Sequence, residues 1–99
     1  MVEKRTPHCK LDIVKSFVGA GKVRVTSSAR IGPAALGLEL ADMLTVLIAL
    51  TPADFHKSMT THIDHTIWQD VYLPSTLVGD VYLKLTVIDD VLIVSFKEL

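Results

Sequence analysis

The stretch DVYLKLTVIDDVLIVSFKE, residues 80–98, decides the fold because it has the pattern of a complete β-hairpin. Two runs rich in Val, Leu and Ile flank the pair Asp89-Asp90, which predicts a two-residue turn. Side chains alternate between the two faces of a strand, so this turn predicts one entirely apolar face. Its members are Val81, Leu83, Leu85, Val87, Leu92, Val94 and Phe96. A slip of one residue would turn this row toward water, so the register is well specified.

The opposite face of the hairpin carries mostly polar side chains. In the predicted register Tyr82 lies opposite Lys97 and Lys84 lies opposite Ser95, with about 4.5–5.5 Å between opposed Cβ atoms. A phenol beside one ammonium group and diagonal to a second is suited to binding an anion. The alternative is an ordinary amphipathic hairpin whose exposed face happens to hold lysine and tyrosine. The members of this face are Tyr82, Lys84, Thr86, Ile93, Ser95 and Lys97.

The first half of the chain predicts mainly helices. Residues 10–20 have apolar side chains at helical spacing, and residues 22–28 alternate like a short strand. Residues 27–38 are helical in composition, but we expect Gly32-Pro33 to split them into two short pieces. Residues 41–50 are apolar nearly all round, which predicts a buried helix.

The second half predicts one more short helix and then strands. A helix is expected to begin at Thr51, because threonine is a good N-cap and Pro52 suits the first helical position. This helix would carry His56 and Lys57. Residues 66–74 read as a strand, rich in β-branched and aromatic residues. Together with the hairpin, this order predicts a single domain of all 99 residues, of the α+β class, with N-terminal helices and an antiparallel sheet.

Composition and charge narrow the class of protein. Hydrophobic residues make up 49% of the chain, which predicts a folded protein, and the apolar run 43–50 is less than half of a membrane span. The net charge of −1 is uneven: seven basic and two acidic residues give +5 over residues 1–30, whereas three lysines and nine carboxylates give −6 over residues 31–99. The basic third suits a polyanion or an acidic partner, or is simply a solvated surface.

Cysteine and histidine content bear on the compartment and on metals. The single Cys9 cannot close an internal disulfide, and the start of the chain has no apolar segment typical of a secretory signal, so we expect a cytoplasmic protein. His56, His62 and His65 raise the question of a metal site, but structural zinc needs more ligands and the chain has no cysteine pair. We therefore expect no metal and no cofactor.

Three segments resemble the MqsR family of bacterial toxins, also called motility quorum-sensing regulators. They are EKRTPH (3–8), DFHKSMTTHIDHTIWQDVY (54–72) and VYLKLTVIDDVLIVSFKE (81–98), and the resemblance extends to the spacing between them. It implies a fold similar to the RelE/YoeB ribonucleases. It also implies an mRNA interferase that cuts single-stranded mRNA at GC-containing triplets, chiefly GCU, without a metal.

The same resemblance implies a protein partner. The toxins of this family belong to toxin–antitoxin pairs, in which a cognate antitoxin binds and neutralises the toxin. That antitoxin has a zinc-binding N-terminal domain and a helix-turn-helix C-terminal domain, so contact with DNA is expected only through the antitoxin. No contact with a membrane is expected. The alternative is a non-catalytic interaction protein that acts only through its DNA-binding antitoxin.

The resemblance further implies a set of catalytic residues. The family's catalytic lysine, glutamine, tyrosine and C-terminal lysine match four residues of this chain: Lys57, Gln69, Tyr82 and Lys97. Tyr82 and Lys97 are the same pair that the hairpin register brings together. Lys84 and His56 are auxiliary candidates, and His56 stands where a known member of the family has tyrosine.

Overall fold

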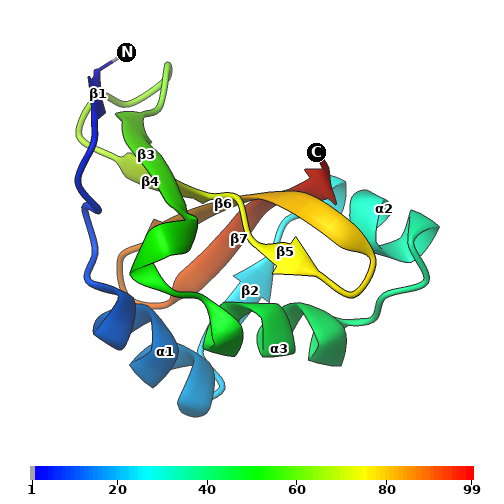
Figure 1. Ribbon diagram of the computed structural model, residues 1–99. Coiled ribbons are helices and arrows are strands. Elements are labelled where there is room, and N and C mark those ends of the chain that lie inside the picture. The colour runs from blue at the N-terminus through cyan, green and yellow to red at the C-terminus, as the bar shows by residue number, and fades with distance from the viewer. Residues whose placement is uncertain (1) are drawn as a thin grey trace.

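The computed structural model describes residues 2–99 and contains a seven-stranded sheet and three α-helices (Figure 1). The strands lie in the order β1-β3-β4-β6-β7-β2, and β5 pairs with β6 off this path. All pairs are antiparallel except β2 with β7, which are parallel. The α+β class is thus confirmed, but the sheet is mixed, because β2 joins the edge of β7 in the same direction.

The strands are β1 (Glu3–Lys4), β2 (Val23–Val25), β3 (Phe55–Thr60), β4 (Trp68–Tyr72), β5 (Ser75–Thr76), β6 (Gly79–Val87) and β7 (Val91–Glu98). The helices are α1 (Leu11–Gly19), α2 (Ser27–Ala35) and α3 (Leu40–Ala49), with a 3₁₀ turn η1 (Pro52–Asp54).

The helices cover only one face of the sheet. Helices α1 and α3 lie below the sheet in Figure 1, whereas α2 lies against the edge of β7. The hydrophobic core forms between these helices and the facing side of β4, β6 and β7. Its buried members are Val14, Val18, Ala29, Met43, Leu47, Leu50, Tyr72, Val81, Leu83, Leu85, Val91, Ile93 and Phe96. Alternate residues of the same strands point to the other face, which no helix of residues 2–99 covers.

Helix α1 confirms the helix predicted over residues 10–20. It begins after Lys10, whose backbone is extended, and it buries Val14 and Val18. Gly21, two residues beyond its end, has a φ of +73°, a left-handed conformation that glycine adopts without steric cost. Gly21 therefore helps the chain to leave the helix.

The predicted split of residues 27–38 is wrong, because α2 continues through Gly32 and Pro33. Pro33 lies in the last turn, where its missing N–H removes only one helical hydrogen bond. The helix ends after it in a Schellman motif, with the Leu38 N–H donating to the Pro33 carbonyl at 2.8 Å. Gly32 is needed for packing, since a Cβ there would collide with the carbonyl oxygen of Phe96 on β7.

Helix α3 is buried on one side only, in contrast to the prediction of a buried helix. Met43 and Leu47 are buried, but Leu40 and Ile48 are 46% and 48% exposed. The sheet covers a single side of this helix, and no other element of residues 2–99 covers the opposite side. No single helix among the described residues is long and apolar enough to cross a membrane; α2 and α3 meet those criteria only as a pair bent by 93°.

The helix predicted to carry His56 and Lys57 is not present. Thr51 does cap a turn as expected, since its N–H donates to the Asp54 carboxylate at 2.8 Å. The turn is only η1, however, because Phe55 already has an extended backbone and pairs with β4. His56 and Lys57 therefore lie on β3. Pairing across the sheet has overridden the local helix signal.

The predicted register of the β6–β7 hairpin is correct at the end distant from the turn. Leu83 pairs with Phe96, and the polar pair Tyr82 and Lys97 also lies opposite one another. Nearer the turn, the register shifts by one residue after Lys84.

A β-bulge at Val94 causes this shift. Leu85 pairs with Ile93, and Val87 pairs with Val91, so the loop holds residues 88–90 rather than two aspartates alone. As a result Val91 and Ile93 point into the core, whereas Leu92 and Val94, expected on the apolar face, are partly exposed. The bulge lies beside β2, which pairs with Val91, Leu92 and Ile93, and Arg24 of β2 forms an ion pair with Asp90.

The close approach of α2 to β7 predicts the effect of adding one methyl group. Gly32→Ala should lower the free energy of unfolding by about 1–3 kcal/mol, because the new Cβ forces α2 away from β7. Gly19→Ala is the matched control: nothing lies within 4 Å of its added Cβ, and its φ is not left-handed. Its effect should be neutral or stabilising by about 0.4–1 kcal/mol. Denaturant unfolding would measure both, and equal stability of the two variants would contradict this packing.

Candidate active site

The uncovered face of the sheet brings the candidate lysines together. Lys57 on β3 pairs with Val71 on β4, and Val71 pairs with Lys84 on β6. Paired residues of antiparallel strands point to the same side of the sheet, so the two lysines flank Val71. Val71 is 0% exposed although no helix lies above it. The aliphatic parts of the long side chains around it therefore shield it from water.

Three further candidates lie on the same face. Tyr82 pairs with Lys97 in the adjoining row, and Lys97 Nζ lies 5.2 Å from the centroid of the Tyr82 ring, within range of a cation–π interaction. Gln69 lies two residues before Val71 on β4, and alternation directs its side chain to the same side. Lys57, Gln69, Tyr82, Lys84 and Lys97 are called the cationic face below.

Positive charge is concentrated on the cationic face. Partial burial lowers the pKa of Lys84, and the nearby charges of Lys97 and Lys57 lower it further. Within residues 2–99, neither Lys84 nor Lys97 forms an ion pair with a carboxylate. An anion placed between these ammonium groups would relieve their mutual repulsion, so the arrangement favours phosphate binding.

His56 does not belong to this group. The register shifts between Phe55 and Lys57, so His56 is the extra residue of a β-bulge in β3. Its side chain is exposed, and it makes no hydrogen bond within the described part of the chain. Of the residues proposed from the sequence, five therefore come together and His56 lies beside them.

The N-terminal strand adds a residue that the sequence did not indicate. The carboxylate of Glu3 lies on β1 and accepts a hydrogen bond from Lys57 Nζ at 2.9 Å. Lys57 lowers the pKa of Glu3 through this bond and through its charge. The two residues are 54 positions apart, so no local spacing relates them. In the sequence, Glu3 was distinguished only as the first residue of the segment EKRTPH.

A buried carboxylate holds the N-terminal segment in place. Asp70 on β4 is 4% exposed and accepts hydrogen bonds from the backbone N–H groups of His8 and Cys9, both at 3.0 Å, and from the hydroxyl of Ser58. The carbonyl oxygen of Thr6, 3.1 Å from the Ser58 hydroxyl, shares the single hydrogen of that hydroxyl with Asp70. Residues 6–9 are thus tied to β3 and β4 on the face opposite the cationic face.

Aromatic stacking adds to this attachment. The rings of His8 and Trp68 are stacked with centroids 5.3 Å apart, and Lys4 Nζ lies 4.2 Å from the Trp68 ring centroid. Trp68 therefore contacts the N-terminal segment of its own chain. Within residues 2–99, no cluster of three or more His, Cys, Asp or Glu side chains could hold a metal ion.

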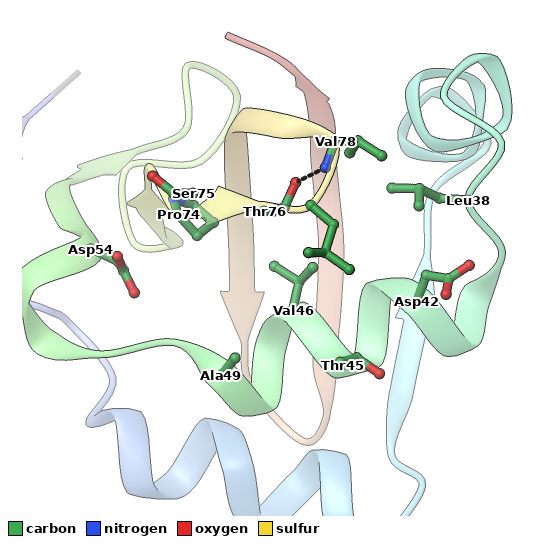
Figure 2. A pocket seen from close by; sticks show the side chains of 11 residues that line it. Leu38, Asp42, Thr45, Val46, Ala49, Asp54, Pro74, Ser75, Thr76 and Val78 are labelled. Atoms are coloured by element: carbon green, nitrogen blue, oxygen red, sulfur yellow. Dashed lines mark hydrogen bonds between the residues drawn. The ribbon is translucent and has the colours of Figure 1, made fainter.

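The best-formed pocket lies elsewhere. It has a volume of about 490 Å³ and lies between α3 and the turn that joins β5 to β6. Figure 2 shows Thr45, Val46 and Ala49 of α3 on one side of it and residues 75–78 on the other. Neither this cavity nor one of about 180 Å³ beside α2 is lined by a residue of the cationic face. The cationic face is thus an open surface, which suits an extended polymer better than a small ligand.

Comparison with known proteins connects this geometry to a family. The chain matches the family described as "Motility quorum-sensing regulator, toxin of MqsA" over residues 6–98. It belongs to the MqsR toxin family. The mRNA interferase toxin MqsR of Escherichia coli (strain K12) is 60% identical over 97 residues, which cover 98% of this chain and 99% of that protein. The resemblance of the three sequence segments is therefore confirmed, and this chain, like the family, is a toxin of an MqsA antitoxin.

The closeness of the three ammonium groups can be tested in this MqsR-family chain without measuring activity. Lys97→Met should raise the pKa of Lys84 toward its ordinary value of 10.5, because it removes a neighbouring positive charge. NMR titration of the lysine side-chain resonances would measure the change. Lys10→Met, at the start of α1, is the control and should leave the pKa of Lys84 unchanged. An unchanged pKa of Lys84 in both variants would show that the ammonium groups of Lys97 and Lys84 are not close to one another.

Proposed function

We propose that this chain is the toxin of a type II toxin–antitoxin system and cleaves single-stranded mRNA on the cationic face. As a member of the MqsR family that is 60% identical to an mRNA interferase, it is an endoribonuclease. The observation that supports the location of the reaction is the alignment of three lysines and Tyr82 on one uncovered face of the sheet. By the family resemblance, the cleaved sequences contain GC, and GCU is the preferred triplet.

The reaction follows from the chemistry of RNA itself. The 2′-oxygen attacks the adjacent phosphorus, the bond from phosphorus to the 5′-oxygen breaks, and the products carry a 2′,3′-cyclic phosphate and a 5′-hydroxyl. Extra negative charge develops on the phosphoryl oxygens in the transition state. Positioned cations stabilise that charge and usually make the largest single contribution to catalysis. On the cationic face the lysine ammonium groups supply this charge, so the proposed reaction uses no metal ion.

Each residue of the cationic face has a proposed role. Lys57 and Lys97 bind the two non-bridging oxygens of the phosphate from opposite sides. Tyr82 donates a hydrogen bond to the phosphate, and Lys84, whose pKa is lowered, protonates the leaving 5′-oxygen. Gln69 has both a donor and an acceptor, so it can recognise the edge of a base.

The uneven charge of the chain supports RNA binding despite a net charge of −1. Arg5 follows β1 in the chain, and its positive charge acts on the Glu3 carboxylate beside Lys57. Phosphates of an RNA strand extending beyond the cleavage site would therefore meet a further positive side chain. This local field, rather than the total charge, attracts the substrate.

The family also supports inferences about fold relationship, partner and compartment. We infer that the α+β architecture is that of the RelE/YoeB ribonucleases. The antitoxin is inferred to have a zinc-binding N-terminal domain and a helix-turn-helix domain, so that this chain meets DNA only through that partner. The inferred site of action is the cytoplasm, where mRNA is present.

Three substitutions test the proposed catalytic face. Lys57→Ala should reduce the cleavage rate of a GCU-containing RNA by about 10²–10³, the cost of removing one group that stabilises transition-state charge. Gln69→Ala and Tyr82→Phe should reduce it as well. The measurement is the rate of cleavage of a naked synthetic RNA, with its cut sites and end groups mapped and the folding of each variant checked by circular dichroism.

The control is Lys22→Ala, which removes a lysine before β2, away from the cationic face. Undiminished cleavage by all three site variants would refute the assignment. Expression in cells separates the enzyme from an inert interaction protein. Growth arrest with RNA decay, reversed by the antitoxin, is expected; normal growth would instead favour a protein that acts only through its antitoxin.

A further inference from the structure

The mechanism proposed above needs a group that takes the proton of the 2′-hydroxyl. Glu3 lies on the correct face for this step, because β1 pairs it with Met59, and Met59 pairs with Gln69. Its carboxylate oxygen Oε1 lies 2.9 Å from Lys57 Nζ. Any phosphate bound by Lys57 would therefore bring its ribose close to this carboxylate.

We propose that Glu3 is the general base of RNA cleavage in this protein. This assignment rests on the proposed function, because it concerns the same site and the same phosphate. The carboxylate of Glu3 accepts the proton of the 2′-hydroxyl while Lys57 holds the phosphate that this oxygen attacks.

The other side chains of the cationic face do not supply such a base. Lysine ammonium groups carry no free lone pair, and the glutamine amide is not basic. The hydroxyl of Tyr82 is assigned above as a hydrogen-bond donor to the phosphate. Within residues 2–99 only two ion pairs join a lysine or arginine to a carboxylate, Arg24 with Asp90 and Lys57 with Glu3. Glu3 is therefore the only carboxylate in the described chain that is paired with a lysine of the cationic face.

The charge state of Glu3 fits the role. The hydrogen bond and positive charge of Lys57 lower the pKa of Glu3 below its ordinary value of 4.5, so the carboxylate is ionised at neutral pH. Binding of RNA shifts this balance, because the phosphate shares Lys57 and adds negative charge nearby. Both effects raise the pKa of Glu3, which makes it a stronger base only when substrate is present.

The fold positions Glu3 from both sides along the chain. Before it, the Val2 N–H donates to the Thr60 hydroxyl and the Thr60 N–H donates to the Val2 carbonyl, both at 2.8 Å. After it, residues 6–9 are held by the buried Asp70. The side chain of Glu3 nevertheless remains 46% exposed, so a ribose can reach it.

The positions of the base and the acid agree with in-line displacement. Glu3 lies on β1, beyond Lys57, whereas Lys84 lies two strands away on the other side of Lys57. The proton of the 2′-hydroxyl passes to Glu3, the 2′-oxygen bonds to phosphorus, and the 5′-oxygen leaves with a proton from Lys84. Glu3 then returns its proton to solvent and Lys84 regains one.

Glu3→Gln, which preserves the shape of the side chain, tests the assignment. It should lower kcat by about 10²–10⁴, the usual contribution of one proton-transfer group. Binding of a non-cleavable 2′-O-methyl RNA should be unchanged or tighter, because a negative charge is removed. Glu98→Gln is the matched control: Glu98 is exposed and pairs with the core residue Val81, on the opposite face, so its kcat should equal that of wild type.

The pH profile distinguishes Glu3 from a histidine base. Because kcat/KM reports the free enzyme, its acidic limb should lie below pH 4.5, whereas a histidine base would place it near the ordinary imidazole pKa of about 6.5. Glu3→His should restore part of the activity and move the acidic limb up toward pH ~6.5.

A substrate in which sulfur replaces the bridging 5′-oxygen distinguishes the role of the base from that of the acid. A thiolate leaves without accepting a proton, so cleavage of this substrate still needs the base but no longer needs the acid. Glu3→Gln should remain slow on this substrate. Recovery of its rate to that of wild type would overturn the role of Glu3 as base.

One other result would overturn the proposal while leaving the proposed function intact. It is a kcat of Glu3→Gln equal to or above that of wild type, with or without a change in KM, as expected if Glu3 merely competes with phosphate for Lys57. If the wild-type chain failed to cleave naked RNA, the proposed function would fail, and the role of Glu3 with it.

Discussion

The helices of this protein cover one face of its sheet, and the candidate active site depends on that asymmetry. Residues on the covered side of β6 and β7 must be apolar to form the core, whereas alternate residues are free to carry charge. Lys57, Lys84 and Lys97 all lie at such alternate positions. Their repulsion costs stability in the free protein, and a bound polyanion would remove that cost.

The buried carboxylate of Asp70, on the opposite face of the sheet, holds in place the N-terminal segment that carries Glu3. It accepts two backbone N–H groups at 3.0 Å and a hydroxyl from Ser58, so its hydrogen-bonding capacity is used although it is 4% exposed. Loss of a partner would leave a charge buried without compensation, which is costly. The N-terminal segment is therefore fixed to β3 and β4, and Glu3 stays beside Lys57.

The sequence predicted the parts of the structure that depend on local pattern. The pairing of Tyr82 with Lys97 followed from strand alternation and a short turn, and the structure confirms it. The shift at Val94 could not be predicted in this way, because β2, which lies beside the bulge, comes from a distant part of the chain. Lys57 was wrongly expected on a helix, because the capping signal at Thr51 is local and real. The pairing of β3 with β4, which lies later in the chain, ends the turn before Lys57.

The most direct test of the account is to locate the phosphate of a bound RNA. A non-cleavable 2′-O-methyl RNA containing GCU would be titrated into the protein while NMR follows the lysine side-chain resonances. If the phosphate binds on the cationic face, the resonances of Lys57, Lys84 and Lys97 should shift together, and that of Lys15 on the helix-covered side should not. Shifts confined to lysines outside the cationic face would contradict it.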